Sequence, residues 1–177
     1  VTKKSRYSAK SNYNRSAELT VKENPVIWDG TEETDFFNTR SEALIGVECK
    51  IYTASQLAGI NSLLRSQDEE IQQYIKSGYV EFKLMNDIYL NEDWENYLSW
   101  DKEPPKNKWT PIGNEKSPFT ASFNGNGHTI YGLYIDTKED GQGLFGEAEY
   151  CGYESSIKNL TIKNAYIKGG RRVGAIG

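Results

Sequence analysis

The hydrophobic pattern of the chain changes character twice. Short alternating segments at 18–21, 25–28 and 46–52 predict strands, separated by turn-prone residues such as Asp29-Gly30. From residue 53 the apolar positions recur at helical spacing, as Leu57, Ile60, Leu63 and Leu64 and again as Ile71, Tyr74 and Ile75. Thr53 followed three residues later by Gln56 is typical of a capping box, and Gly78 predicts the end of the second helix.

After residue 78 the pattern returns to short apolar segments. Residues 79–90 alternate as a strand does, and residues 91–113 form a polar, Trp-rich excursion. The remainder alternates between junctions rich in Gly and Asn and segments of five or six residues that carry Ile, Leu or Phe. Gly and Asn supply the positive φ that sharp corners need, so this pattern predicts coils of short strands joined at corners.

Two stretches of this region repeat. The pattern I-x-[GN]-L-x-I occurs at 130–135 and again 27 residues later at 157–162, and GLFG at 143–146 matches GAIG at 174–177. We predict that the first stretch lies directly over the second, with Ile130 over Ile157 and Leu133 over Leu160. The residues assigned to this repeat are Ile130, Leu133, Ile135, Ile157, Leu160, Ile162, Gly143 and Gly146.

The predicted fold class is therefore mostly β, a parallel β-helix or β-solenoid that begins with one or two short capping helices. We divide the chain into a basic flexible leader (1–16), an N-terminal β segment of unknown type (17–52), a helical cap (53–78) and the coils (79–177). The leader carries only basic charges, which are typical of a solvated arm. A basic arm that docks on a polyanion and an extended segment that pairs with another subunit are the alternatives, and the local sequence does not separate them.

Several segments in order resemble the GLUG-motif proteins of bacterial surfaces. These segments are NDIYL, WTPIG, FTASFNGNGHTIYGLYI, GLFG, IKNLTIKNAYIKG and VGAIG, and with the helical lead-in they cover residues 51–177. Similar runs occur in large adhesin-like proteins and in the stalks of some IgA-cleaving metallopeptidases. The resemblance implies a right-handed parallel β-helix and a surface location. The motif is a scaffold without chemistry of its own, and such solenoids usually run for many coils, so we expect a fragment of a longer protein or an end covered by a partner.

Composition narrows the classes of partner. The 177 residues carry a net charge of −4, which gives no general attraction to nucleic acid or to anionic lipid. No apolar run is long enough to insert into a membrane. A long-range disulfide between Cys49 and Cys151 and two free thiols are both compatible with the sequence. No sequence motif calls for a cofactor.

The tryptophans of the excursion are candidate glycan-binding residues. Trp94, Trp100 and Trp109 would stack on pyranose faces, while nearby acids would accept hydrogen bonds from hydroxyl groups. The acids Asp87, Glu92, Asp93, Glu95 and Asp101 also raise the alternative of polysaccharide cleavage. The plainer interpretation is an ordinary loop whose Trp side chains cover the body of the fold.

Two other motifs carry weaker signals. Asp136, Asp140 and Glu147 match part of a calcium-binding loop, but Lys138 stands where an oxygen ligand belongs, and we expect no metal there. His128 is the single histidine and is expected to be structural, since no HExxH motif or nucleophile motif accompanies it. The corner residues Asn124, Asn126, Asn159 and Asn164 are expected to form a structural ladder.

The function predicted from the sequence is a non-enzymatic, extracellular structural or adhesion module of a bacterial surface protein or appendage. The alternatives are a carbohydrate-binding or carbohydrate-active β-helix domain and a phage tail-fibre segment. The expected partners are a host or bacterial surface glycan or protein, or another copy that associates through the open solenoid edge. Neither nucleic acid nor membrane insertion of this segment is expected, and no cofactor.

Overall fold

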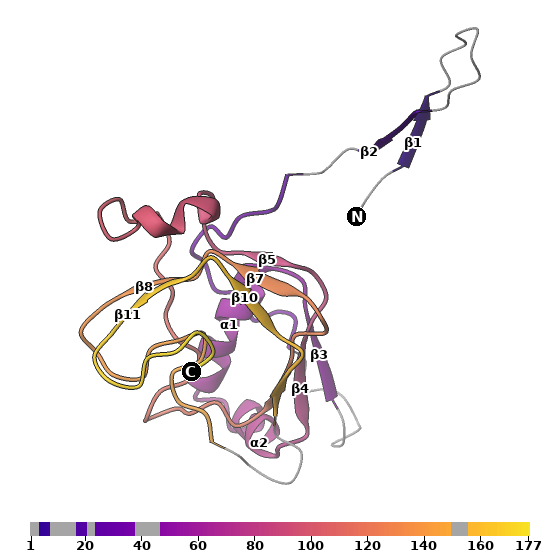
Figure 1. Ribbon diagram of the computed structural model, residues 1–177. Coiled ribbons are helices and arrows are strands. Elements are labelled where there is room, and N and C mark those ends of the chain that lie inside the picture. Colours follow the sequence, from indigo (N-terminus) through magenta and orange to yellow (C-terminus); the bar gives the residue numbers. More distant parts are fainter. Residues whose placement is uncertain (1–3, 8–16, 21–23, 38–46, 150–155) are drawn as a thin grey trace, which may run out of the picture.

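The computed structural model describes residues 4–7, 17–20, 24–37, 47–149 and 156–177 (Figure 1). Strand β1 (Lys4–Tyr7) pairs antiparallel with β2 (Ala17–Thr20). The predicted leader therefore contains β1, and its other residues lie outside the described ranges. Cys151 also lies outside them.

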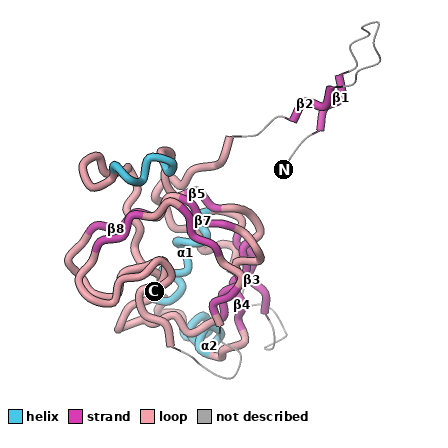
Figure 2. Tube along the Cα trace, viewed as in Figure 1, coloured by secondary structure: helices cyan, strands magenta, loops and turns pink. Residues whose placement is uncertain are grey.

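The main body contains three sheets of short parallel strands (Figure 2). The first has the order β3-β4-β6-β9, the second β5-β7-β10 and the third β8-β11. Their bounds are β3 (Val47–Ile51), β4 (Val80–Leu84), β5 (Ile88–Tyr89), β6 (Ser122–Asn124), β7 (Thr129–Tyr131), β8 (Tyr134–Asp136), β9 (Ile157–Lys158), β10 (Thr161–Lys163) and β11 (Tyr166–Lys168).

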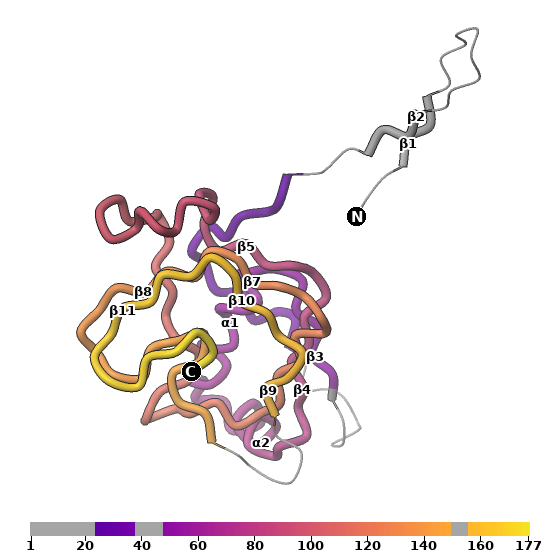
Figure 3. The backbone as a smooth tube through the Cα atoms, viewed as in Figure 1, coloured from indigo at the N-terminus to yellow at the C-terminus, as the bar shows by residue number. Residues whose placement is uncertain are grey.

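Strand order within each sheet follows chain order, so successive turns of the chain lie side by side (Figure 3). We call these turns passes: the first contains β4 and β5, the second β6, β7 and β8, and the last β9, β10 and β11. In the inward columns, Phe82 pairs with Phe123 and then Ile157, Ile88 with Ile130 and then Ile162, and Ile135 with Ile167. Outside the three sheets, isolated parallel bridges connect neighbouring passes, from Ile112 to Phe145 and from Gln142 to Val173. Side chains alternate along each strand, so one set of these positions fills the core and the other faces outward.

The register differs from the predicted one. Ile130 pairs with Ile162, and Ile157 pairs with Phe123 instead of lying beside Ile130. The prediction was wrong because the Ile and Leu residues around the corner between β7 and β8 have the same spacing as those around the corner between β9 and β10. The matched sequences therefore belong to different sheets, and β7 was aligned with β9 when its partner is β10. The predicted match between the glycine-rich segments 143–146 and 174–177 agrees with the structure. A Cβ on Gly143 would lie 2.6 Å from the carbonyl oxygen of Gly174, so these two segments are neighbours.

Two helices lie within the range predicted for the cap. Helix α1 (Ala54–Leu64) begins at Thr53, whose side chain accepts a hydrogen bond from the Gln56 N–H. Helix α2 (Glu69–Lys76) begins at Asp68, whose carboxylate accepts hydrogen bonds from two N–H groups of the first turn. These caps satisfy backbone donors that have no partner inside the helix.

Helix α1 closes one end of the stack. Its buried Asn61 side chain donates to the carbonyl oxygens of Thr110 and Pro111 and accepts from the Gly113 N–H, so the helix is joined to the wall of the first pass. Gly59 lies against residues 24–37, because a Cβ there would come within 1.8 Å of the Glu33 carbonyl oxygen. The start of the stack is thus covered by α1 and by residues 24–37.

The structure therefore shows parallel sheets of short strands with few helices, which agrees with the coarse prediction of a mostly β chain with short helices. Corner positions use positive φ at Gly132 and at Asn126, Asn159 and Asn164. The Asn159 side-chain amide donates to Asn124 Oδ1 at 3.2 Å, and this hydrogen bond connects two adjacent passes. It is one contact of the expected Asn ladder. Among the described residues, no helix is long and apolar enough to cross a membrane.

Candidate functional site

The Trp-rich excursion folds onto the main body, and its 3-10 helix η1 (Trp94–Ser99) stands beside the second and third sheets (Figure 1). Trp100 is completely buried, its Nε1 donates to Asp93 Oδ2 at 2.9 Å, and its ring meets Tyr134 edge-on. Trp109 is 2% exposed, and its Nε1 donates to the Leu144 carbonyl oxygen at 3.1 Å. Buried ring faces cannot stack on a sugar, which corrects the glycan-binding assignment of Trp100 and Trp109.

Trp94 is half-buried and belongs to an outward-facing aromatic cluster with Tyr89 and Tyr131. The Tyr89 and Tyr131 rings stack with centroids 4.7 Å apart and an angle of 6° between their planes, as register neighbours on β5 and β7. The Trp94 ring lies 4.8 Å from the Tyr131 centroid, and Lys163 of β10 lies 6.0 Å from that centroid on the same column. The cluster fixes η1 to the wall and leaves part of the Trp94 surface accessible.

Two buried asparagines hold the ends of the excursion together. Asn91 Oδ1 accepts from the Asn107 N–H, and Asn91 Nδ2 donates to the carbonyl oxygens of Asn107 and Gly132. Asn107 Nδ2 in turn donates to the carbonyl oxygens of Trp28 and Leu90. The network links the excursion to the N-terminal segment. Neither residue stands out in the sequence, because Asn is equally common in exposed turns and its burial is not visible there.

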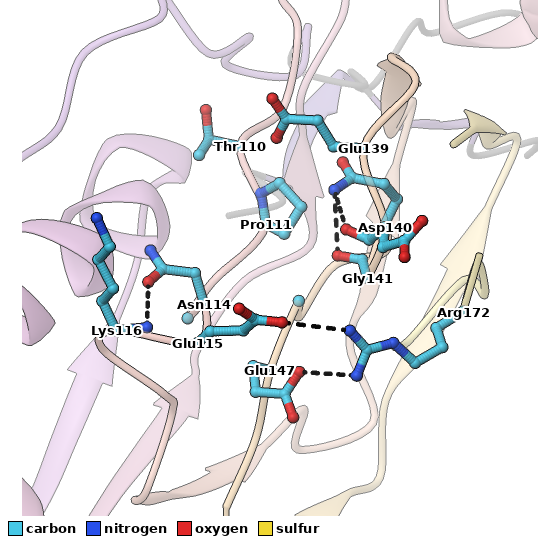
Figure 4. A pocket seen from close by; sticks show the side chains of 13 residues that line it. Thr110, Pro111, Asn114, Glu115, Lys116, Glu139, Asp140, Gly141, Glu147 and Arg172 are labelled. Carbon is cyan, nitrogen blue, oxygen red and sulfur yellow. Dashed lines mark hydrogen bonds and ion pairs between the residues drawn. The ribbon is translucent and has the colours of Figure 1, made fainter. Parts of the chain in front are cut away.

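A cavity of about 500 Å³ opens between the first two passes and the end of the third (Figure 4). No aromatic residue is among those that line it; charged and polar residues dominate, chiefly Asn114, Glu115, Lys116, Glu139, Asp140, Glu147 and Arg172. Figure 4 shows the Arg172 guanidinium between Glu115 and Glu147, at 3.7 Å and 3.4 Å. Arg172 has φ of 56°, a backbone conformation that costs free energy for a residue with a Cβ.

Asp140 is held in its ionised form. Its carboxylate accepts from the Arg171 N–H at 2.8 Å and from Arg171 Nε at 3.0 Å. The backbone hydrogen bond from Arg171 is the largest cause that lowers the pKa of Asp140, and the Arg171 side chain lowers it further against the opposing effect of burial. A carboxylate with a lowered pKa is a poor general acid, so Asp140 is not suited to donate a proton.

The calcium-like residues do not converge on one point. Asp136 pairs with Lys168 at 3.2 Å, Asp140 with Arg171 and Glu147 with Arg172. Within the described ranges no group of three His, Cys, Asp or Glu side chains is arranged to hold a metal ion. These three acids instead connect one pass to the next through ion pairs.

Three other titratable residues have defined surroundings. His128 Nδ1 lies 3.2 Å from Asp87 Oδ1, and the same oxygen accepts from the Thr129 N–H at 2.9 Å. Cys49 is a free, buried cysteine, and burial raises the pKa of its thiol to about 11, so the reactive thiolate is scarce at neutral pH. Asp93 accepts from the buried Trp100 and takes no part in a carboxylate pair that the structure describes.

Comparison with known proteins finds two relatives of much greater length. A Gly-rich membrane protein of Evansella cellulosilytica is 34% identical over 101 residues, which cover 56% of this chain and 10% of that protein. Halomucin of Haloquadratum walsbyi is 41% identical over 70 residues, which cover 37% of this chain and 1% of that protein. No family model and no solved structure matches. The chain is therefore similar to small parts of very large proteins, one of them named as a membrane protein.

Proposed function

We propose that this chain is a non-enzymatic structural or adhesion module of an extracellular surface protein, built as a right-handed β-solenoid of the GLUG-motif type. The observation that carries the proposal is the register of the passes: Ile88, Ile130 and Ile162 stack in one inward column, while Tyr89, Tyr131 and Lys163 stack outward beside them. Such a stack gives a rigid, elongated body whose length grows with each added coil.

The similarity to parts of very large proteins supports a scaffold role. A module of this kind contributes length and spacing, and it need not carry its own ligand site. The ion pairs between passes support the same role, since Glu81 with Lys158, Asp136 with Lys168 and Asp140 with Arg171 each join different passes. Like the apolar columns, these ion pairs favour one alignment of each pass against the next.

The residues described here also favour a non-enzymatic role. Three carboxylates of the pocket lining, Glu115, Asp140 and Glu147, are paired with guanidinium groups. The one cysteine among the described residues is buried and has a raised pKa, and the ion-pair partner of His128 is Asp87. None of these arrangements provides a nucleophile next to a base.

Protease treatment of intact cells of the source organism tests the surface role. We expect trypsin to release peptides from residues 79–177 while the cells remain intact, because lysines lie on the outer face of the passes. Peptides from an abundant ribosomal protein serve as the control for lysis and are expected to be absent. Release of these peptides only after lysis would contradict the proposal.

Carbohydrate binding is a second candidate function, and one observation favours it: Trp94 and Tyr131 together form a half-exposed aromatic surface beside Lys163. Aromatic surfaces of this kind bind the apolar faces of sugars. Trp94→Ala is expected to abolish any signal on a glycan array, whereas Tyr79→Ala, an exposed tyrosine elsewhere, should leave it unchanged. An array without signals for the native chain would remove this candidate.

A further inference from the structure

The corner between β6 and β7 carries a reactive sequence that the proposed function does not use. The four residues Asn124, Gly125, Asn126 and Gly127 contain the two places in the chain where glycine directly follows asparagine. Asparagine before glycine is the pair most prone to spontaneous deamidation, because glycine has no Cβ to hinder the approach of its nitrogen to the asparagine side chain. The contacts of the corner decide which of the two pairs reacts in the folded chain.

The first pair is held inside the stack. Asn124 is half-buried at the end of β6, and its Oδ1 accepts from the Asn126 N–H at 2.9 Å and from the Asn159 side-chain amide at 3.2 Å. Gly125 is buried, its N–H donates to the Lys158 carbonyl oxygen at 2.9 Å, and a Cβ there would lie 2.4 Å from the Asn159 carbonyl oxygen. The Gly125 nitrogen therefore has no room to turn toward the Asn124 side chain while the last pass is in place.

The second pair lies in a turn at the surface. Asn126 and Gly127 are both exposed, and no atom apart from the chain neighbours lies within 4 Å of a Cβ built on Gly127. Their φ angles are 52° and 78°, and the His128 N–H donates to the Gly125 carbonyl oxygen at 2.8 Å. Positive φ at both central residues is typical of a type I′ turn, which favours Asn-Gly. The same sequence that makes the turn therefore leaves its asparagine open to attack.

Two hydrogen bonds hold this turn to the passes on either side. Asn126 Nδ2 donates to the Leu84 carbonyl oxygen of the first pass at 3.1 Å, and the Gly127 N–H donates to the Asn159 carbonyl oxygen of the last pass at 3.0 Å. Reaction at the second pair requires only that this turn opens locally. Reaction at the first pair requires β6 to separate from β9, and such larger openings cost more free energy than local ones.

We propose that Asn126 is a site of spontaneous deamidation, and that its modification loosens the stack at this corner. The Gly127 nitrogen loses its proton to water or hydroxide and bonds to Asn126 Cγ, the Cγ–Nδ2 bond breaks, and ammonia leaves. Water then opens the resulting cyclic imide at either of its two carbonyl carbons, which gives aspartate or isoaspartate. The net reaction consumes water and releases ammonia, and it involves neither an oxidant nor a reductant.

Both products weaken the contact between passes. Aspartate replaces the Nδ2 donor by a carboxylate oxygen that faces the Leu84 carbonyl oxygen, so a hydrogen bond becomes a repulsion. Isoaspartate also lengthens the main chain by a methylene group between β6 and β7, which displaces Ile130 from its column between Ile88 and Ile162. The inference goes beyond the proposed scaffold role, because it names the place where the stack ages, and it does not depend on a surface location.

Peptide mapping of the full chain during incubation at mildly alkaline pH tests the assignment. Trypsin releases residues 117–138 as one peptide, and its fragment ions separate Asn124 from Asn126. In the folded chain we expect deamidation of Asn126 to be at least about tenfold faster than that of Asn124. In urea the two residues should react at similar rates, both faster than in the folded chain. Enzymatic methylation of isoaspartate identifies the second product.

The chain supplies a matched control for the reaction. Asn159 is exposed and has the same φ of 52° as Asn126, but it precedes Leu160, whose side chain hinders the attack. We expect Asn159 to remain unmodified over the same time.

Asn126→Gly is the matched variant, because glycine accepts the positive φ of the turn and carries no amide. After incubation the native chain should unfold at a lower temperature than before, whereas the unfolding temperature of Asn126→Gly should not change.

Three results would overturn the inference. Equal rates at Asn124 and Asn126 in the folded chain would mean that the corner does not discriminate between them. A folded chain in which Asn126 stays intact while the chain in urea reacts would mean that the turn is fully protected. An incubated chain with modified Asn126 and an unchanged unfolding temperature would mean that the modification does not loosen the stack. The proposed surface role is separate, since peptide release from intact cells tests it.

Discussion

The pass that contains β6, β7 and β8 and the pass that contains β9, β10 and β11 follow one plan with different outcomes. Ile130 and Ile162 are register partners on adjacent strands, yet Ile130 is completely buried and Ile162 is only half-buried. The inner pass has neighbours on both sides, whereas the last pass has a described neighbour on one side only. Burial in this architecture is therefore set by the next layer more than by the local sequence.

The largest expected effect comes from the same substitution at both positions. Ile130→Ala should lower the free energy of unfolding by about 3 kcal/mol, because it removes buried methylene and methyl groups and leaves a cavity. Ile162→Ala should cost about 1 kcal/mol, since much of that side chain is already in contact with water. Urea denaturation followed by circular dichroism measures both. Equal losses would mean that the last pass is covered as fully as the inner one.

A corner position sharpens the comparison. Gly132 and Asn164 follow register partners on β7 and β10, and both have positive φ, 75° and 54°. Gly132→Ala should cost about 1–2 kcal/mol for the left-handed conformation and more for contact with Trp94, whose Cβ would lie 2.8 Å from the new Cβ. Asn164→Ala carries only the conformational cost, about 1 kcal/mol. Thermal unfolding of the two variants should rank them in this order, and the reverse order would contradict the tight contact at the inner corner.

The smallest effect concerns an ion pair between the two passes. Arg171 lowers the pKa of Asp140, so the folded state favours the ionised carboxylate more strongly than the unfolded chain does. The resulting stabilisation is complete above the unfolded pKa of about 3.9 and is lost as the pH falls through the lower folded value.

We therefore expect Asp140→Asn to be less stable than the native chain near neutral pH and equally stable at strongly acidic pH. Unfolding curves at a series of pH values measure this difference. Glu139→Gln, an exposed neighbour in the pocket lining, is the control and should show no such dependence. A difference between Asp140→Asn and the native chain that persists below the folded pKa would show that the substitution acts through packing and not through charge.

Local signals in the sequence were sufficient for the secondary structure of the cap and the corners. Thr53 predicted the start of α1, and the Gly and Asn junctions predicted positive φ at Gly132, Asn159 and Asn164. Local signals were insufficient for the candidate site. Trp100 and Trp109 look the same as Trp94 in a polar segment, and only the folded chain places the first two in the interior. The acids that resemble a calcium loop are likewise separated by their individual cationic partners.

The sequence by itself determined that this chain consists of short strands, sharp corners and two capped helices, because each of these depends on a few adjacent residues. The tertiary structure alone decided which strand lies beside which, and so paired Ile130 with Ile162 and Phe123 with Ile157. The physical reason is that consecutive walls carry the same spacing of apolar residues. The choice among equivalent registers depends on loop lengths and on contacts between residues more than thirty positions apart.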